Sequence, residues 1–222
     1  MRTKMMDREM PDYTKGEEIF NMTTHIVGGA LGVAALVLCI IVSAVHHNGY
    51  GLAGSIVFGV SMILLYTMSS VYHGLRDGRG KRVLQVLDHC TIYVLIAGTY
   101  TPILLSAMRP IDPLSSWVLL GVMWGLAALA ITLTAIDLRK FRVFSMICYL
   151  GMGWAAIFRL RLMIQALTWA GFALILGGGV CYTIGAVLYG MGRKKRYMHS
   201  VFHMFVVAGS VLHTLAILLY VL

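Results

Sequence analysis

Long apolar runs, separated by short polar segments, make up most of this chain. A helix that spans the hydrocarbon core of a bilayer needs about 20 predominantly apolar residues. The pattern therefore predicts an all-α, polytopic membrane protein, folded as a seven-transmembrane helix bundle. The seven apolar runs lie at residues 25–45, 51–73, 86–107, 115–136, 143–158, 167–190 and 199–221.

The fifth run is the weakest of the seven. Residues 143–158 would extend about 24 Å at 1.5 Å per residue, short of the roughly 30 Å hydrocarbon core. Arg159 and Arg161 follow directly, and their long side chains can reach the interface while their stems stay among lipid chains. We therefore keep this run as a span.

The distribution of positive charge predicts the orientation and supports the count of seven. With the N-terminus inside and the C-terminus outside, the outer segments contain only Arg109, Arg159 and Arg161 of the 18 Lys and Arg residues. This agrees with the tendency of Lys and Arg to remain in cytoplasmic loops. Without the fifth span, the basic segment GRKKR (192–196) would lie outside.

Composition agrees with a membrane protein and narrows its partners. Hydrophobic residues make up 59% of the chain and charged residues 12%, against about 45–50% and about 25% in soluble domains. The net charge of +9 lies in short clusters between apolar runs, which predicts contact with anionic head groups and no nucleic acid. The four cysteines occur singly within apolar runs, so neither a disulfide framework nor a thiolate metal site is expected.

The chain is expected to form one integral domain behind a short polar segment. Residues 1–24 carry both signs of charge and lack the pattern of a signal peptide. We interpret them as a cytoplasmic N-terminal segment. Residues 25–222 then form the seven-transmembrane domain, which is expected in the cell (inner or plasma) membrane; the pattern leaves the oligomeric state open.

Ionisable residues gather at the predicted inner ends of three spans. His73 ends the second span, Asp88 opens the third, and His199 and His203 open the seventh. Ionisable residues within a membrane are costly and are therefore functional candidates. Because His199 and His203 are about one helical turn apart, they can offer two imidazoles to one ion.

Together with His73, this pair would form a site of three histidines, which suits catalytic zinc with a fourth position left to water. Asp88 could orient a histidine or the water from behind the ligands. Ser69, four residues before His73, shares its helix face. His213 lies about 15 Å beyond His203 along a straight helix, and is instead expected to make an interhelical hydrogen bond.

Simpler interpretations are available for each of these residues taken alone. Two histidines at a helix start can be interfacial imidazoles, and His73 can end its span without a metal. Asp88 can be an acid at a helix N-terminus, where the helix dipole stabilises its charge. His89 lies about 100° around the helix from Asp88 and is interpreted as a packing residue or as support for a ligand.

Five segments resemble the haemolysin III family, the bacterial branch of the progestin and adipoQ receptor (PAQR) superfamily. The resemblance covers nearly the whole chain, from about residue 18 to the C-terminus, and the segments follow the family order. They are EEIFNMTTH (17–25), SSVYH (69–73), LDHCTIYVLIAGTYTP (87–102), YLGMGW (149–154) and HSVFHMFVVAGSVLH (199–213).

The resemblance implies zinc ligands at His73, His199 and His203, with Ser69 and Asp88 beside the metal. The related alkaline ceramidases suggest that zinc activates a water molecule that cleaves a lipid amide. Asp88 would act as base or water-orienting residue, and Ser69 as a hydrogen-bond donor. Glu18, Asn21 and His25 match the N-terminal motif of the family. We expect these residues to act at the start of the helix or in packing.

Two hypotheses of function follow. The first is a zinc-dependent hydrolase of lipid amide or ester bonds, whose substrate is a membrane lipid. The second is a non-enzymatic membrane protein with structural zinc, acting as a sensor, a membrane homeostasis factor or a cytolysin. Structural zinc usually has a closed fourth position, whereas catalytic zinc keeps one position open.

Overall fold

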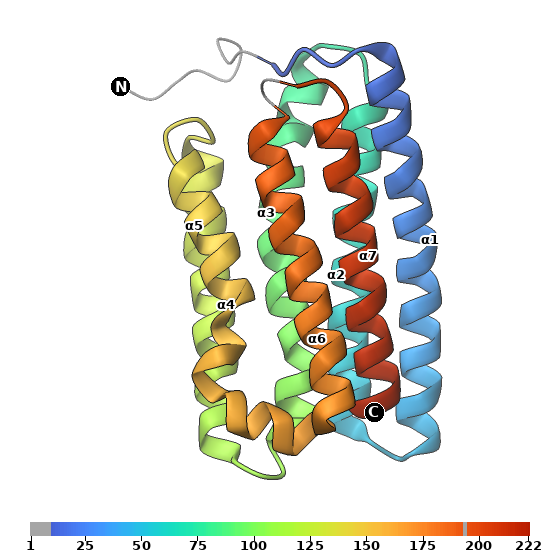
Figure 1. Cartoon of the computed structure of the whole chain (residues 1–222), viewed down its shortest axis with the longest axis vertical. Helices are drawn as coiled ribbons and strands as arrows, with labels where there is room; N and C mark the ends of the chain where they lie inside the picture. The colour runs from blue at the N-terminus through green and yellow to red at the C-terminus, as the bar shows by residue number, and fades with distance from the viewer. Residues whose placement is uncertain (1–9, 193–194) are drawn as a thin grey trace.

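The computed structural model describes residues 10–192 and 195–222, and within these ranges all regular structure is helical. The α-helices stand side by side as a bundle (Figure 1), which confirms the predicted all-α architecture. They are α1 (Lys15–Val45), α2 (Gly49–Gly74), α3 (Arg79–Pro102), α4 (Pro113–Ile136), α5 (Arg142–Gly153), α6 (Leu160–Met191) and α7 (Met198–Tyr220). A π-helical segment, Ile103–Met108, continues α3, and a 3-10 turn, Ala155–Arg159, joins α5 to α6.

Six stretches of helix in the described residues are long and apolar enough to cross a membrane, one fewer than the sequence predicts. The difference lies in Arg142–Met191, a stretch of 50 residues that contains both α5 and α6. A straight helix of this length would extend about 75 Å, more than twice the hydrocarbon core. Figure 1 shows α5 descending and α6 rising, so the chain crosses the bundle twice within this stretch. A kink at Thr168 (φ 61°, ψ 171°) interrupts α6 near its start.

The first helix begins at Lys15, well before the apolar run predicted from residue 25. Thr14 caps it by accepting a hydrogen bond from the Glu17 N–H, and the Glu17 carboxylate accepts one from the Thr14 N–H. This reciprocal arrangement satisfies two backbone donors at the helix start. Glu17 also accepts a hydrogen bond of 2.6 Å from the Tyr197 N–H, which ties the start of α1 to the turn before α7.

Small residues allow α1 and α2 to pack closely. A Cβ atom added to Gly28 would lie 2.5 Å from the Tyr66 ring, and one added to Gly59 would lie 2.5 Å from Leu36 Cβ. Membrane helices approach one another most closely where no side chain separates their backbones. Large apolar side chains along α1 and α4 are exposed, as expected of surfaces that face lipid.

One end of the bundle collects most of the basic loops. The α2–α3, α4–α5 and α6–α7 connections lie at the end where α1 begins (Figure 1). The start of α7, which bears His199, and the last turn of α2, which bears His73, lie at the same end. The positive-inside rule predicts that this end faces the cytoplasm.

Candidate metal centre

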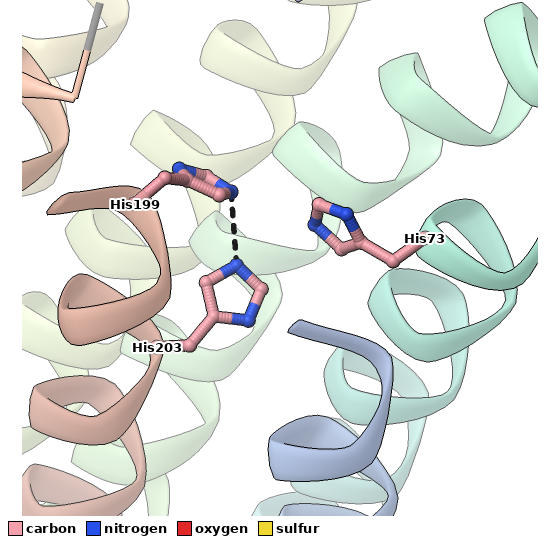
Figure 2. A group of neighbouring side chains, drawn as sticks. All are labelled: His73, His199 and His203. Carbon is pink, nitrogen blue, oxygen red and sulfur yellow. Dashed lines mark hydrogen bonds between the residues drawn. The ribbon is translucent and has the colours of Figure 1, made fainter. Parts of the chain in front are cut away.

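Three buried histidines meet at the basic end of the bundle. His73 comes from the last turn of α2, and His199 and His203 come from the first two turns of α7. One ring nitrogen of each lies within 4.8 Å of one nitrogen of each of the others, so the group could hold a metal ion. Figure 2 shows the three rings facing one another across a small space.

The distances between ligand atoms suit a small cation. The Nε2 atoms of His199 and His203 lie 3.0 Å apart, as a hydrogen bond in which one ring donates and the other accepts. Nitrogen ligands about 2.0–2.1 Å from a tetrahedral zinc ion lie about 3.3 Å from one another. A small shift of the His73 ring and of the α7 pair would therefore bring all three nitrogens to ligating distance.

The orientation of His73 is fixed by a carboxylate from α1. The Nδ1–H of His73 donates to Glu18 Oε2 at 2.6 Å, and this leaves Nε2 buried without a hydrogen-bond partner among the described residues. The other Glu18 oxygen accepts a hydrogen bond of 2.5 Å from Lys81 Nζ, which also donates to the Leu75 carbonyl. A carboxylate behind a histidine fixes its tautomer and raises its basicity as a ligand.

Two further rings stack against the α7 histidines. His25 of α1 lies parallel to His203, with ring centroids 3.7 Å apart and planes at 24°. Tyr13, just before α1, stacks on His199 with centroids 4.9 Å apart and planes at 20°. Burial raises the pKa of Tyr13 well above its usual value, so its hydroxyl stays neutral. These rings restrict the imidazoles and cover the cluster from two sides.

The N-terminal motif residues thus contact the cluster rather than only starting a helix. Glu18 bonds to His73, His25 stacks on His203, and Asn21 Nδ2 lies 3.5 Å from His73 Nδ1. The sequence did not single out Tyr13 or Lys81. Tyr13 lies in a polar segment without a recognisable pattern, and Lys81 is one of several basic residues of a loop.

Ser69 and Asp88 lie beside the cluster and line a cavity that His199 and His203 also line. Ser69 is buried one turn before His73 on α2, and its hydroxyl interacts with the Asp88 carboxyl group. Asp88 is half-buried and lies about two and a half turns into α3, which begins at Arg79, before the apolar run predicted from residue 86. Neither belongs to the group of atoms that could hold the metal, so the structure places them next to the ligands rather than among them.

His89 and His213 each bond to a backbone carbonyl, and among the described residues neither belongs to a group that could hold a metal. His89 Nδ1 bonds to the Gln85 carbonyl at 2.8 Å, and its Nε2 lies 3.2 Å from the Tyr189 hydroxyl. His213 Nε2 donates to the Ile175 carbonyl of α6 at 3.0 Å, which is the predicted interhelical hydrogen bond.

The cavity has a volume of about 160 Å³ and extends from the histidine cluster between α3, α5, α6 and α7. Apart from the residues near the cluster, its walls are mostly apolar and aromatic. Ile92, Leu150 and Trp154 are examples, and His213 lies at its far part. A space of this kind can take an extended apolar chain whose polar end reaches the histidines.

Comparison with known proteins gives matches along the whole chain. Residues 13–214 match the family described as "Haemolysin-III related". "Hemolysin-3" of Bacillus cereus is 38% identical over 220 residues, which cover 99% of this chain and 98% of that protein. The "Hemolysin-3 homolog" of Bacillus subtilis (strain 168) is 36% identical over 208 residues, 94% of this chain and 96% of that protein.

A more distant relative links the chain to eukaryotic proteins. The "Monocyte to macrophage differentiation factor" of Homo sapiens is 26% identical over 168 residues, which cover 72% of this chain and 67% of that protein. This PAQR-type relative supports the superfamily assignment made from the sequence motifs. Together with the six apolar stretches, the matches indicate a multi-pass protein, consistent with the cell membrane. The chain belongs to the haemolysin III family.

Proposed function

We propose that this protein is an intramembrane zinc hydrolase that cleaves an amide or ester bond of a membrane lipid. His73, His199 and His203 would hold the zinc ion. A donor set of three imidazoles suits zinc, and three protein ligands are typical of its catalytic sites. The buried Nε2 of His73 supports this assignment, because it has no hydrogen-bond partner among the described residues and belongs to a group of imidazoles close enough to share one ion.

The observation that carries the proposal is that the cluster and the apolar cavity share the same space. His199, His203, Ser69 and Asp88 all line the cavity. An acyl chain in the cavity would therefore bring its polar linkage next to the histidines. Hydrolysis needs this proximity, because a bound geometry close to attack removes much of the entropic barrier.

The chemistry would be divided among a few groups. Zinc, when bound, would acidify a water molecule and polarise the carbonyl of the substrate. The Asp88 carboxylate, which is half-buried and lines the cavity, would accept the proton of the attacking water and return it to the leaving amine or alcohol as the C–N or C–O bond breaks. The Ser69 hydroxyl, which is buried beside Asp88 and lines the cavity, would donate a hydrogen bond to the developing oxyanion. Glu18 would hold His73 in its ligating orientation.

Release of fatty acid from a panel of lipids tests this proposal. We expect the purified, zinc-loaded protein to release fatty acid from at least one amide- or ester-linked lipid, and His203→Ala to abolish the release. His47→Asn is a matched control, because His47 is an exposed histidine of the α1–α2 loop. Asn tolerates the positive φ of 51° at this position. Release that His203→Ala leaves unchanged would refute the assignment.

A structural role for the metal is the second candidate, and the burial of the cluster favours it. His73, His199 and His203 are only 3%, 8% and 1% exposed. In that case removal of zinc would lower the melting temperature, but no lipid of the panel would be cleaved. A cytolytic version would also release dye from liposomes, and this leakage should occur at low protein density if the protein forms pores.

A further inference from the structure

Arg142 stands at the exposed edge of the cavity that contains the histidine cluster. It is the first residue of α5, it is exposed, and it lines the same cavity as His199 and His203. Its guanidinium makes no hydrogen bond or ion pair with any other residue that the structure describes. The cavity therefore runs from buried imidazoles to an exposed cation whose donors are available to a ligand.

The turn that carries Arg142 is well defined. Asp137 Oδ1 accepts hydrogen bonds of 3.1 Å from the N–H groups of Arg139 and Lys140, and the Asp137 carbonyl accepts one from the Phe141 N–H. The following helix has no side-chain cap at its N-terminus. The partial positive charge of that helix end therefore adds to the charge of the guanidinium.

The two ends of the cavity differ in chemistry, and this difference selects a class of ligand. Arg142 is the only Lys or Arg among the described lining residues, and most of the wall beyond it is apolar. Guanidinium groups bind phosphate through paired hydrogen bonds. Anionic lipids would also be attracted by exposed cations on the neighbouring loops, namely Arg139, Lys140, Lys195 and Arg196.

We propose that Arg142 binds the phosphate of a lipid head group, and that the cavity prefers phosphate-bearing lipids to neutral lipids with the same acyl chain. This inference rests on the proposed function in that it takes the cavity as the substrate site, and it names the substrate class. Arg142 is then a specificity-determining residue at the mouth of the cavity. The acyl chain lies along the apolar wall.

Equilibrium binding with two matched lipids tests the inference. The probes are a lysophosphatidic acid and the monoacylglycerol with the same acyl chain, added to the purified full-length protein in neutral detergent. We expect the wild type to bind the phosphate-bearing lipid roughly tenfold more tightly or better, as one charge-assisted contact would give. Arg142→Gln should remove this preference. Its affinity for the monoacylglycerol should stay within about twofold of wild type, a change much smaller than the roughly tenfold expected from one charge-assisted contact.

Two further variants separate a specific site from general surface charge. Arg139→Gln removes an exposed arginine of the same turn that does not line the cavity, and it should reduce the preference far less than Arg142→Gln does. Arg142→Lys should keep part of it, because lysine still binds phosphate as a point charge. Equal affinity of the wild type for the two lipids would overturn the inference. So would an equal loss from Arg139→Gln and Arg142→Gln.

Inorganic phosphate and a variant without turnover complete the design. If the ligand is a lipid, inorganic phosphate alone should not displace lysophosphatidic acid at concentrations near the lipid's Kd. Displacement at these concentrations would mean that the site binds free phosphate. In His203→Ala, turnover is removed while Arg142 is intact, so the phosphate preference should persist. Absence of hydrolysis with every lipid, together with a persisting preference, would reject the proposed function alone. Hydrolysis of neutral lipids without any preference would reject the Arg142 inference alone.

Discussion

The two ends of α7 carry the same side chain in different chemical settings. In the first two turns, His199 and His203 lie with their Nε2 atoms 3.0 Å apart, and His73 faces them with a buried Nε2 that has no described partner. About three turns further on, His213 donates its Nε2–H to the Ile175 carbonyl of α6. The first setting gathers imidazoles around one point, and the second joins two helices.

The two settings differ in the hydrogen-bond partners and the neighbouring imidazoles of each ring. Glu18 engages Nδ1 of His73 and directs the lone pair of Nε2 toward two other imidazoles. A carbonyl engages His213, and in the part of the chain that the structure describes His213 joins no group that could hold a metal. A histidine in a membrane span therefore becomes a candidate ligand through its neighbours, and not through its burial, which both ends share.

Removal of a ligand should have the largest effect and would separate the two ends most clearly. We expect His203→Ala to reduce bound zinc from about one ion per chain to a small fraction, a loss greater than the roughly 10–100-fold of a supporting residue. His213→Leu should keep the zinc content of the wild type. Elemental analysis of the purified proteins measures both. Equal zinc content in the two variants would remove the distinction between the ends of α7.

Loss of the carboxylate behind His73 should have the next largest effect. Glu18→Gln keeps the size of the side chain but removes the negative charge that accepts the hydrogen bond from His73 Nδ1–H and pairs with Lys81. We expect zinc affinity to fall about 10–100-fold, measured by competition with a chelator of known affinity. Asp77→Asn is the matched control, because its carboxylate is exposed and pairs loosely with Arg82 at 3.5 Å. An equal loss in that control would mean that overall charge, and not orientation of His73, sets the affinity.

The three histidines of this centre could be predicted from the sequence, because their positions along the apolar runs fix their depth in the membrane. A histidine at the end of one apolar run and a pair one turn apart at the start of another must lie near the same membrane surface if the spans alternate in direction. That argument gave His73, His199 and His203 together. It also gave His213 its separate role, because a straight helix places it too far along the axis.

The supporting residues could not be predicted in the same way, because their contacts depend on how helices rotate and pack. Glu18 lies in a charged segment that the apolar pattern assigned to the cytoplasm, yet α1 begins at Lys15 and carries it beside His73. Tyr13 reaches the cluster from just before α1, and Lys81 from the first turn of α3. Figure 1 shows the predicted fifth span as a segment separate from the sixth, although helix length and hydropathy alone give one stretch, Arg142–Met191.

Crowding at the far end of α7 provides a test that removes no polar side chain. A Cβ atom at Gly178 of α6 would overlap the His213 ring, whereas one at the adjacent Gly179 would meet nothing within 4 Å. We expect Gly178→Ala to destabilise the protein by about 1–3 kcal/mol through overpacking. Gly179→Ala should be neutral or stabilising by up to about 1 kcal/mol. Thermal or denaturant unfolding in detergent measures both, and equal stabilities would mean that α6 and α7 are not held at this spacing.

The smallest effect is expected from the hydrogen bond of His213 itself. His213→Leu keeps most of the side-chain volume and removes the donor to Ile175, and interhelical hydrogen bonds in membranes contribute about 0.6 kcal/mol on average and up to about 1.7. The unfolding free energy should fall by this amount while zinc content and zinc affinity stay those of the wild type. A small loss of stability with unchanged metal binding is the opposite of the result expected for His203→Ala, where the metal is lost first. If His213→Leu instead weakened zinc binding, the far end of α7 would be coupled to the metal centre, and the two ends could no longer be treated as independent.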